Sequence, residues 1–341
     1  MNPVLVEVFR KDTVESMHRG AVVAVNSEGR TILEHGDINA LVFPRSSLKP
    51  LQAIPLAESG ALEHFDMSGR ELALACASHS GEEQHRQVLK GWMQRVGLTP
   101  AELECGPSLP FDKAASEQWL RDGGEAGKEL HNCSGKHTGM LTLAAFQGHS
   151  LAGYSEYDHP TQQGWLSLLS ELSGVNAADM PWDKDGCGLP TVALPLVAFA
   201  RSFIPFIAAA DSHAKRDVAM AKITTAMRSH PEMVAGTNRC CTASMANIDG
   251  LMVKVGAEGV FIAVAIEAGV TIALKADDGA GRAAEVMLGA ALRQLRLLSD
   301  EQYRNLANWY SPLVVNSQNA VVGAIKASEV WSSKTVGTRP K

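Results

Sequence analysis

The sequence predicts an α+β protein, because its strand-like and helix-like segments are segregated along the chain. β-prone runs fill about the first forty residues, helix-compatible segments fill the middle, and β-prone runs return after Asp249-Gly250. Such segregation favours one antiparallel sheet, made from both ends of the chain and packed against the helical middle, over alternating βαβ units. We expect a single domain over residues 1–341, with a sheet lobe at about 1–45 and 245–341 and a helical lobe at about 46–244.

The individual elements follow from residue type and spacing. β-prone runs predict strands at 4–9, 21–25 and 31–34, and the Ser27-Glu28-Gly29 turn separates the last two. Helix-compatible patterns predict helices at 47–58, 82–96, 114–121, 136–146, 161–172, 190–203 and 214–229. After Gly250, strands are predicted at 251–255, 260–266 and 270–274, and an amphipathic helix at 281–298.

The composition argues against several classes of protein. The chain has 341 residues, 45% of them hydrophobic, and its formal net charge of −6 comes without a basic patch, which argues against a nucleic-acid partner. No apolar run reaches the roughly 18 residues of a membrane span, and the start has no basic, apolar leader, so we expect a cytoplasmic protein. Six scattered cysteines do not suggest a secreted disulfide framework, and reduced thiols are the default.

The motif Ser46-Ser47-Leu48-Lys49 is the first indication of chemistry. Residues three apart share a helix face, so Ser46 Oγ and Lys49 Nζ are predicted to lie side by side. A lysine whose pKa falls through burial can take the serine proton, and Ser-x-x-Lys is the signature of penicillin-recognising acyl-enzymes. The spacing therefore points to serine acyl transfer. A second Ser-x-x-Lys, at Ser212–Lys215, is interpreted as a helix cap and a solvated lysine.

Three further segments offer companions to this pair. Ser78 follows an apolar run in a tight polar turn, and Lys254 lies on a predicted strand just before Gly256, which would let a substrate approach the backbone. Arg45 would lower the pKa of Lys49 and hold an anionic group. The alternatives are that Ser78 caps the next helix, that Lys254 faces solvent, and that Arg45 is a surface loop residue.

Two cysteines lie in unusual turns. Cys133 belongs to Asn132-Cys133-Ser134-Gly135-Lys136-His137, at the start of a predicted helix, and Cys187 belongs to Asp185-Gly186-Cys187-Gly188. Two thiols in tight turns are able to meet at one metal, although neither has a Cys-x-x-Cys partner. Buried, inert cysteines are the alternative.

Taken together, these segments resemble the rhizobial-type L-asparaginases, also called the asparaginase II family. The resemblance extends over nearly the whole chain and is most specific at the Cys133 turn and at Gly256-Ala257-Glu258-Gly259. It implies a fold like that of serine β-lactamases and glutaminases, a homodimer, and hydrolysis of L-asparagine to L-aspartate and ammonia.

The resemblance also implies roles for the motif residues. Ser46 corresponds to the nucleophile and Lys49 to its base, while Ser78 and Lys254 correspond to a second Ser–Lys pair. The family binds zinc at the positions of Cys133, Lys136 and Cys187, and no organic cofactor is expected. The expected substrate-binding residues are Arg45, His79, His137, Asp185 and Gly256.

Other functions stay open at this point. Glutamine or another small amide is an alternative substrate, since one methylene is worth only about 1–3 kcal/mol of discrimination. A non-enzymatic protein that binds a metal or an amino acid is another alternative, as is a lactamase-like esterase. Cys240-Cys241 stands where the family is expected to carry an aromatic and an acidic residue, and Val255 replaces the Thr or Ser of the lactamase motif.

Overall fold

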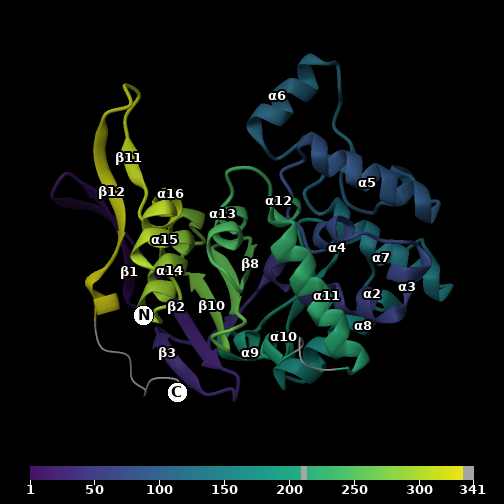
Figure 1. Cartoon of the computed structure of the whole chain (residues 1–341), viewed down its shortest axis with the longest axis horizontal. Helices are drawn as coiled ribbons and strands as arrows, with labels where there is room; N and C mark the ends of the chain where they lie inside the picture. The colour runs from purple at the N-terminus through teal and green to yellow at the C-terminus, as the bar shows by residue number, and fades with distance from the viewer. Residues whose placement is uncertain (209–212, 333–341) are drawn as a thin grey trace. The chain divides into compact units, whose positions relative to one another are not determined.

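The computed structural model describes residues 1–208 and 213–332 (Figure 1). They form two compact units. The first comprises the described residues of Met1–Ser47, Ala193–Ile207 and Ala243–Lys341, and the second those of Leu48–Val192 and Ala208–Thr242. Ser212, which opens the second Ser-x-x-Lys motif, lies outside the described residues.

The first unit is built around one antiparallel sheet with the strand order β11-β12-β1-β2-β10-β9-β8, in which β2 also pairs with β3. Strand β1 pairs with β12 and strand β2 with β10, so strands from the start of the chain lie between strands from its end. The prediction of an α+β protein whose two ends share an antiparallel sheet is therefore confirmed. The strands are β1 (Val4–Arg10), β2 (Thr13–Asn26), β3 (Thr31–His35), β8 (Leu251–Gly256), β9 (Val260–Ala265), β10 (Val270–Ala276), β11 (Leu313–Val315) and β12 (Val321–Ala327).

Helices of the same unit cover this sheet. Helices α9 (Leu196–Arg201) and α14 (Gly281–Gln294) both pack against β2 and β10, and every residue of β9 is buried. Strands that are covered on both faces show continuous apolar runs of this kind. The unit also contains the short pair β4 (Leu41–Val42) and β7 (Leu194–Pro195), helices α15 (Asp300–Asn305) and α16 (Ala307–Tyr310), and the turn η6 (Glu329–Ser332).

Three predicted helices of the chain need correction, and two of them differ from the prediction at one end. The segment 190–203 begins with strands β6 (Pro190–Val192) and β7, and α9 starts only at Leu196, because Pro195 lacks an N–H and disfavours helix in the residue before it. Helix α14 ends at Gln294 rather than at residue 298, since Arg296 adopts a left-handed φ of 58°.

The second unit is helical. Its elements are α1 (Lys49–Gln52), α2 (Ile54–Ser59), α3 (Ala61–His64), α4 (Gly69–Ala75), α5 (Glu83–Val96), η2 (Pro100–Glu102), α6 (Lys113–Arg121), η3 (Lys128–Leu130), α7 (Ser134–Gln147), α8 (Pro160–Ser173), η4 (Ala177–Asp179), α11 (Lys215–Ser229) and α12 (Pro231–Val234), with the hairpin of β5 (Trp182–Lys184) and β6. Helices α10 (Pro205–Ala208) and α13 (Cys240–Asn247) each include residues of both units.

The helix predicted at 47–58 is broken into three pieces. A 3₁₀ turn, η1 (Arg45–Leu48), leads into α1, and α2 begins after Ala53. Pro50 and Pro55 each remove a backbone donor, so a continuous ladder of helical hydrogen bonds is not available here. Gly60, with a φ of 104°, then ends α2.

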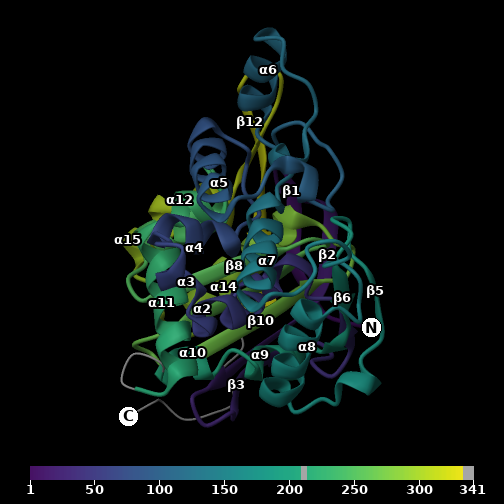
Figure 2. The same cartoon turned by 90° about the vertical axis from the view of Figure 1, so that its right-hand side faces the viewer.

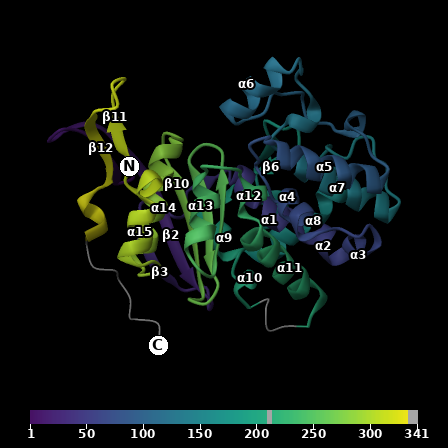
Figure 3. The same ribbon diagram turned by 45° about the horizontal axis from the view of Figure 1, so that its top comes forward.

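Helix α7 is the central helix of the second unit. It packs against α2, α4 and α5 (Figures 2 and 3), and its residues from Ser134 to Ala144 are all buried. A Cβ on Gly135 would lie 2.2 Å from the Leu74 carbonyl oxygen, so only glycine permits this approach of α7 to α4. A helix buried on every side places its polar residues, here Lys136 and His137, inside the protein.

Candidate active site

The turn η1 presents two adjacent serines differently. Ser47 is fully buried and its Oγ donates a 2.6 Å hydrogen bond to the Pro44 carbonyl, whereas Ser46 is half-buried. Arg45, also half-buried, holds a left-handed φ of 54°, a conformation that non-glycine residues seldom adopt and that concentrates at functional sites. Ser47 therefore fixes the turn, and Ser46 is the more accessible hydroxyl.

Lys49 is completely buried at the start of α1. Its Nζ donates to the Ala77 carbonyl at 2.5 Å, to Ser78 Oγ at 3.0 Å and to Cys133 Sγ at 3.1 Å. Burial lowers the pKa of the Lys49 ammonium below its ordinary value of 10.5, although the nearby Cys133 acts in the opposite direction. The structure thus brings together Lys49 and Ser78, which the sequence separates by 29 residues.

The segment that carries Ser78 is fixed by its backbone. Ser78 N donates to the Val234 carbonyl at 2.9 Å, and His79 N donates to the Asn132 carbonyl at 3.1 Å. Gly81 then turns the chain with a φ of 74°. The alternative that Ser78 caps the following helix is not what the structure shows, because α5 begins after Glu82.

His79 has both ring nitrogens engaged within the protein. Its Nδ1 accepts a hydrogen bond from Gly81 N at 3.2 Å, and its Nε2 lies 2.9 Å from Ser134 Oγ, which itself donates to the Glu129 carbonyl. Burial holds the pKa of His79 well below its ordinary value. The geometry uses His79 to tie the Ser78 turn to the start of α7, and its substrate-binding role stays a prediction.

Cys133, Lys136 and Cys187 lie together in this unit and are all buried. Lys136 Nζ is 3.1 Å from Cys187 Sγ. A hydrogen bond between the two sulfur atoms lowers the pKa of Cys133 well below its usual range and raises the pKa of Cys187. Burial lowers the pKa of Lys136, but the sulfur atoms of Cys187 and Cys133 outweigh it, and the net shift is upward.

The donor atoms of these residues fit a zinc site. Thiolates and nitrogen are the ligands that zinc prefers. Within residues 1–208 and 213–332, no group of three or more His, Cys, Asp or Glu side chains is arranged to hold a metal ion. The Lys136 amine, 3.1 Å from Cys187 Sγ, would be the nitrogen donor beside the two thiols, and binding through it would release the lysine proton.

Asp185 opens the turn that presents Cys187. Its N–H donates to the Leu189 carbonyl at 2.7 Å, and its Oδ1 accepts from Gly186 N at 2.6 Å. Gly188 completes the turn with a φ of 88°, which glycine adopts without strain. Through these contacts Asp185 shapes the loop, and its substrate-binding role stays a prediction.

Lys254 and Gly256 lie on β8 of the first unit. Lys254 is buried, with Nζ donating to the Val255 carbonyl at 2.8 Å, so the alternative of a solvent-facing lysine is wrong. A Cβ on Gly256 would lie 2.3 Å from the Pro44 carbonyl oxygen. The group that approaches Gly256 in the structure is therefore the chain's own turn before Ser46.

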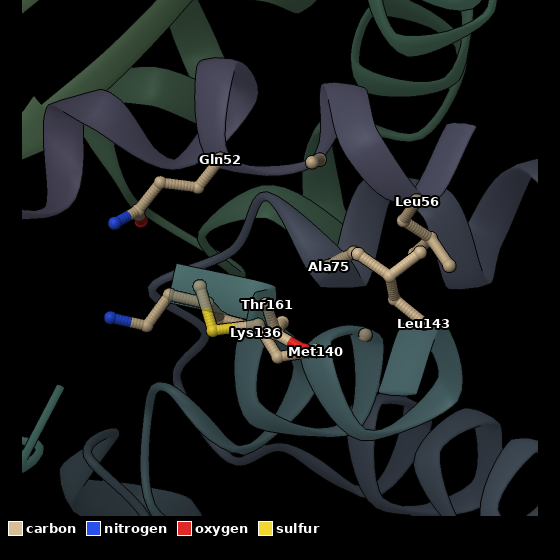
Figure 4. A pocket seen from close by; sticks show the side chains of 9 residues that line it. Gln52, Leu56, Ala75, Lys136, Met140, Leu143 and Thr161 are labelled. Atoms are coloured by element: carbon tan, nitrogen blue, oxygen red, sulfur yellow. The ribbon is translucent and has the colours of Figure 1, made fainter. Parts of the chain in front are cut away.

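A small cavity adjoins Lys136 (Figure 4). Its mainly apolar lining comes from α1, α2, α4, α7 and α8, and its volume of about 10 Å³ accommodates roughly one water molecule. Figure 4 shows the polar ends of Gln52 and Lys136 extending to the same side, away from Leu56 and Leu143. This cavity is too small for an amino acid.

Sequence reasoning missed one residue of this cluster, Tyr154. Its Oη lies 2.6 Å from His137 Nδ1, and it is fully buried. Burial lowers the pKa of His137 well below its ordinary value and raises the pKa of Tyr154. No motif signals Tyr154, because it stands in an irregular loop whose approach to α7 depends on the fold.

Comparison with known families agrees with the resemblance. A family model described as L-asparaginase II matches residues 6–327, and the chain belongs to this family. None of the curated protein sequences that were compared matches the chain.

Solved structures with a similar fold include two that are described as β-lactamases. A putative β-lactamase from Bacteroides dorei DSM 17855 is 13% identical, with a TM-score of 0.42 over 75% of this chain and 84% of that one. A β-lactamase from Mycobacterium bovis is 12% identical, with a TM-score of 0.37 over 82% of this chain and 95% of that one. In the part of the chain that the structure describes, no helix is long and apolar enough to span a membrane.

Proposed function

We propose that this protein hydrolyses L-asparagine to L-aspartate and ammonia. Membership of the L-asparaginase II family supports an amidohydrolase. The observation that carries the proposal is the buried Lys49, whose Nζ contacts Ser78 Oγ and whose pKa is lowered by burial. A buried lysine of lowered pKa beside a serine hydroxyl is able to transfer a proton to and from oxygen without a metal.

In the proposed reaction, Ser46 Oγ attacks the side-chain carboxamide carbon while Lys49 accepts the hydroxyl proton. The tetrahedral intermediate collapses, the C–N bond breaks, and ammonia leaves with a proton delivered through the second pair, Ser78 and Lys254. Water then attacks the aspartyl ester on Ser46, releasing L-aspartate and restoring the hydroxyl. The half-buried position of Ser46 supports its role as the nucleophile, since Ser78 is only 7% exposed.

The substrate's own charges need partners of opposite sign. Arg45 is proposed to bind the α-carboxylate and Asp185 the α-ammonium group. His79, His137 and Gly256 complete the proposed substrate-binding set. Glutamine differs from asparagine by one methylene, worth only about 1–3 kcal/mol of discrimination, so glutamine stays the alternative substrate.

Zinc is the proposed metal, held by Cys133, Lys136 and Cys187. When bound, zinc supplies a Lewis acid that polarises an oxygen ligand. The chain's own contribution is to bury the three donors and, through the hydrogen bond with Cys187, to lower the pKa of Cys133. A homodimer, which the family resemblance implies, and a cytoplasmic location remain proposals.

The test is ammonia release from L-asparagine and from L-glutamine by the wild type and by three serine variants. Ser46→Ala is expected to abolish ammonia release, and mass spectrometry of quenched wild-type enzyme is expected to detect the aspartyl ester. Ser202→Ala is the matched control, because Ser202 is buried, its Oγ donates to the Phe199 carbonyl, and it lies outside the candidate site, so it should retain activity. Loss of activity in Ser78→Ala with retention in Ser46→Ala would instead assign the nucleophile to Ser78.

A chelator arm separates the role of the metal from that of the serines. Activity that survives removal of zinc would make the metal structural. Binding of L-aspartate by Ser46→Ala, with no ammonia release by any form of the protein, would support an amino-acid-binding protein instead of an enzyme.

A further inference from the structure

His137 is fully buried in the first turn of α7, and one of its ring nitrogens lacks a partner. Nδ1 lies 2.6 Å from Tyr154 Oη, whereas Nε2 is buried without a hydrogen bond to any residue that the structure describes. More than nine in ten buried polar groups in proteins are hydrogen-bonded, so an orphaned one calls for an explanation. Here the orphan lies one residue from Lys136.

The direction of the neighbouring hydrogen bonds identifies which nitrogen carries the proton. Glu104 N–H donates to Tyr154 Oη at 2.9 Å. That oxygen carries a single proton, and its other partner is His137 Nδ1. A hydroxyl oxygen is able to accept two hydrogen bonds, but donation from Oη to Nδ1 is the arrangement that gives the phenol proton an acceptor, and it leaves the hydrogen of the neutral imidazole on Nε2.

Tyr154 is held in place at both ends, so this arrangement is rigid. The Glu104 carboxylate accepts hydrogen bonds from Gly153 N at 2.6 Å and from Ser155 N at 3.0 Å, which clamps the loop around Tyr154. Gln162 Nε2 donates to the Tyr154 carbonyl at 2.7 Å. Because Glu104 both clamps the loop and donates to the phenol, the hydroxyl has no freedom to turn away from His137.

His79 provides the contrast. It is buried in the same unit, but its two ring nitrogens bond to Gly81 N and to Ser134 Oγ. His79 is thus satisfied by the protein, whereas His137 keeps one N–H donor without an acceptor among the described residues. His137 directly follows Lys136 along α7, which places it next to a residue of the cluster described above.

We propose that Tyr154 is a positioning residue that holds His137 as its Nε2–H tautomer, and that this N–H donates to an oxygen of the small amino-acid amide substrate. The chemistry required of the ligand is an sp² oxygen acceptor, which both the carboxylate and the carboxamide of asparagine supply. This inference rests on the proposed function for the identity of the ligand, but not for the tautomer.

The first test is independent of activity. Long-range ¹H–¹⁵N NMR of the wild type should show His137 protonated on Nε2 and not on Nδ1, and Tyr154→Phe should populate the Nδ1–H form. Addition of L-aspartate should shift the Nε2–H resonance of His137. A wild-type protein with His137 protonated on Nδ1, or a resonance that L-aspartate leaves unmoved, overturns the proposal. If Tyr154→Phe does not fold, the wild-type spectra decide by themselves.

The second test is kinetic and uses a rescue. Tyr154→Phe should raise KM for L-asparagine by about threefold to tenfold, the effect of one hydrogen bond, with kcat changed by less than about twofold. His137→Gln should keep most of the affinity, because its amide nitrogen occupies the place of Nε2 as a donor, and Tyr154→Phe should add nothing in that background. Equal losses from Tyr154→Phe in both backgrounds would show a merely structural role.

A control and a substrate analogue complete the design. Tyr310→Phe removes another buried hydroxyl, which bonds Ser244 Oγ in the first unit, and should leave KM unchanged. 3-Aminopropanamide is asparagine without its α-carboxylate and identifies the oxygen that His137 contacts. If the carboxylate is the acceptor, Tyr154→Phe should leave the hydrolysis of this analogue unchanged. If the wild type does not hydrolyse L-asparagine, the proposed function fails, and the L-aspartate titration alone decides this inference.

Discussion

Replacing Lys49 by methionine tests the central feature of the site. Methionine keeps the length of the side chain and its apolar stem but removes the amine that contacts Ser78 Oγ and Cys133 Sγ. Loss of a positioned general base lowers catalysis by typically 10²–10⁴-fold, so we expect kcat to fall by at least about 10²-fold. Lys222→Met is the matched control, because Lys222 lies on α11, is 41% exposed and pairs with Glu63.

The effect on stability should be small despite the burial of Lys49. Removing three hydrogen bonds of a charged donor costs about 1.5–3 kcal/mol each, or several kcal/mol in all. Against this, burying an ammonium carries an effective penalty of several kcal/mol, which the methionine variant no longer has. The two terms are of similar size, so the free energy of unfolding of Lys49→Met should lie within about 2 kcal/mol of the wild-type value at neutral pH.

The difference should depend on pH in a defined direction. The pKa of Lys49 in the folded protein lies below its ordinary value of 10.5, so the folded chain binds fewer protons than the unfolded chain between these two pKa values. Stability of the wild type therefore rises with pH in that window, and the penalty for burying the charge is fully present below it. In Lys49→Met, this rise of the free energy of unfolding with pH should be absent.

Urea unfolding of the metal-free proteins between about pH 7 and about pH 10 measures both quantities, alongside ammonia release from L-asparagine. A Lys49→Met variant that retains activity within tenfold of the wild type would refute the assignment of Lys49 as the base. A variant that is destabilised by much more than about 3 kcal/mol would show that Lys49 acts mainly as a structural donor.

Two further predictions follow from the packing and from the thiol pair. Gly135→Ala should destabilise the protein by about 1–3 kcal/mol in urea unfolding, because its Cβ would meet the Leu74 carbonyl oxygen at 2.2 Å. The control is Gly164→Ala, in open space on α8, which should be neutral or stabilising by up to about 1 kcal/mol. Equal effects of the two substitutions would contradict the packing argument. Cys187→Ala should lose bound zinc in elemental analysis. Cys105→Ala should keep it, because burial raises the pKa of the Cys105 thiol to about 11 and keeps it protonated. Zinc retained by Cys187→Ala would show that Cys187 is not a ligand of the metal.

Local signals predicted many helices to within about two residues. Helix α7 was predicted at 136–146 and extends over Ser134–Gln147, where Gly148 ends it in a left-handed conformation. Prediction failed at 190–203, where two prolines interrupt a run of apolar residues that by itself looks helical. Spacing reports periodicity, but the missing N–H of Pro195 decides where the helix is able to begin.

The candidate site was only partly accessible to the same reasoning. The sequence placed Lys49 three residues after Ser46, yet the hydrogen bonds of Lys49 go to Ala77, Ser78 and Cys133. Tyr154 carries no motif at all, and its role follows from one contact to α7.

The sequence by itself determined the α+β class, the membership of the L-asparaginase II family and the local turns that hold the serines and cysteines. Only the tertiary structure decided which polar groups meet and how strongly each holds its proton. The physical reason is range: helix and turn propensities act over a few neighbouring residues, whereas burial and the charges that shift a pKa come from segments that folding brings together. Lys49 is an ordinary lysine in the sequence and becomes a candidate base only when α4 and α7 enclose its ammonium group.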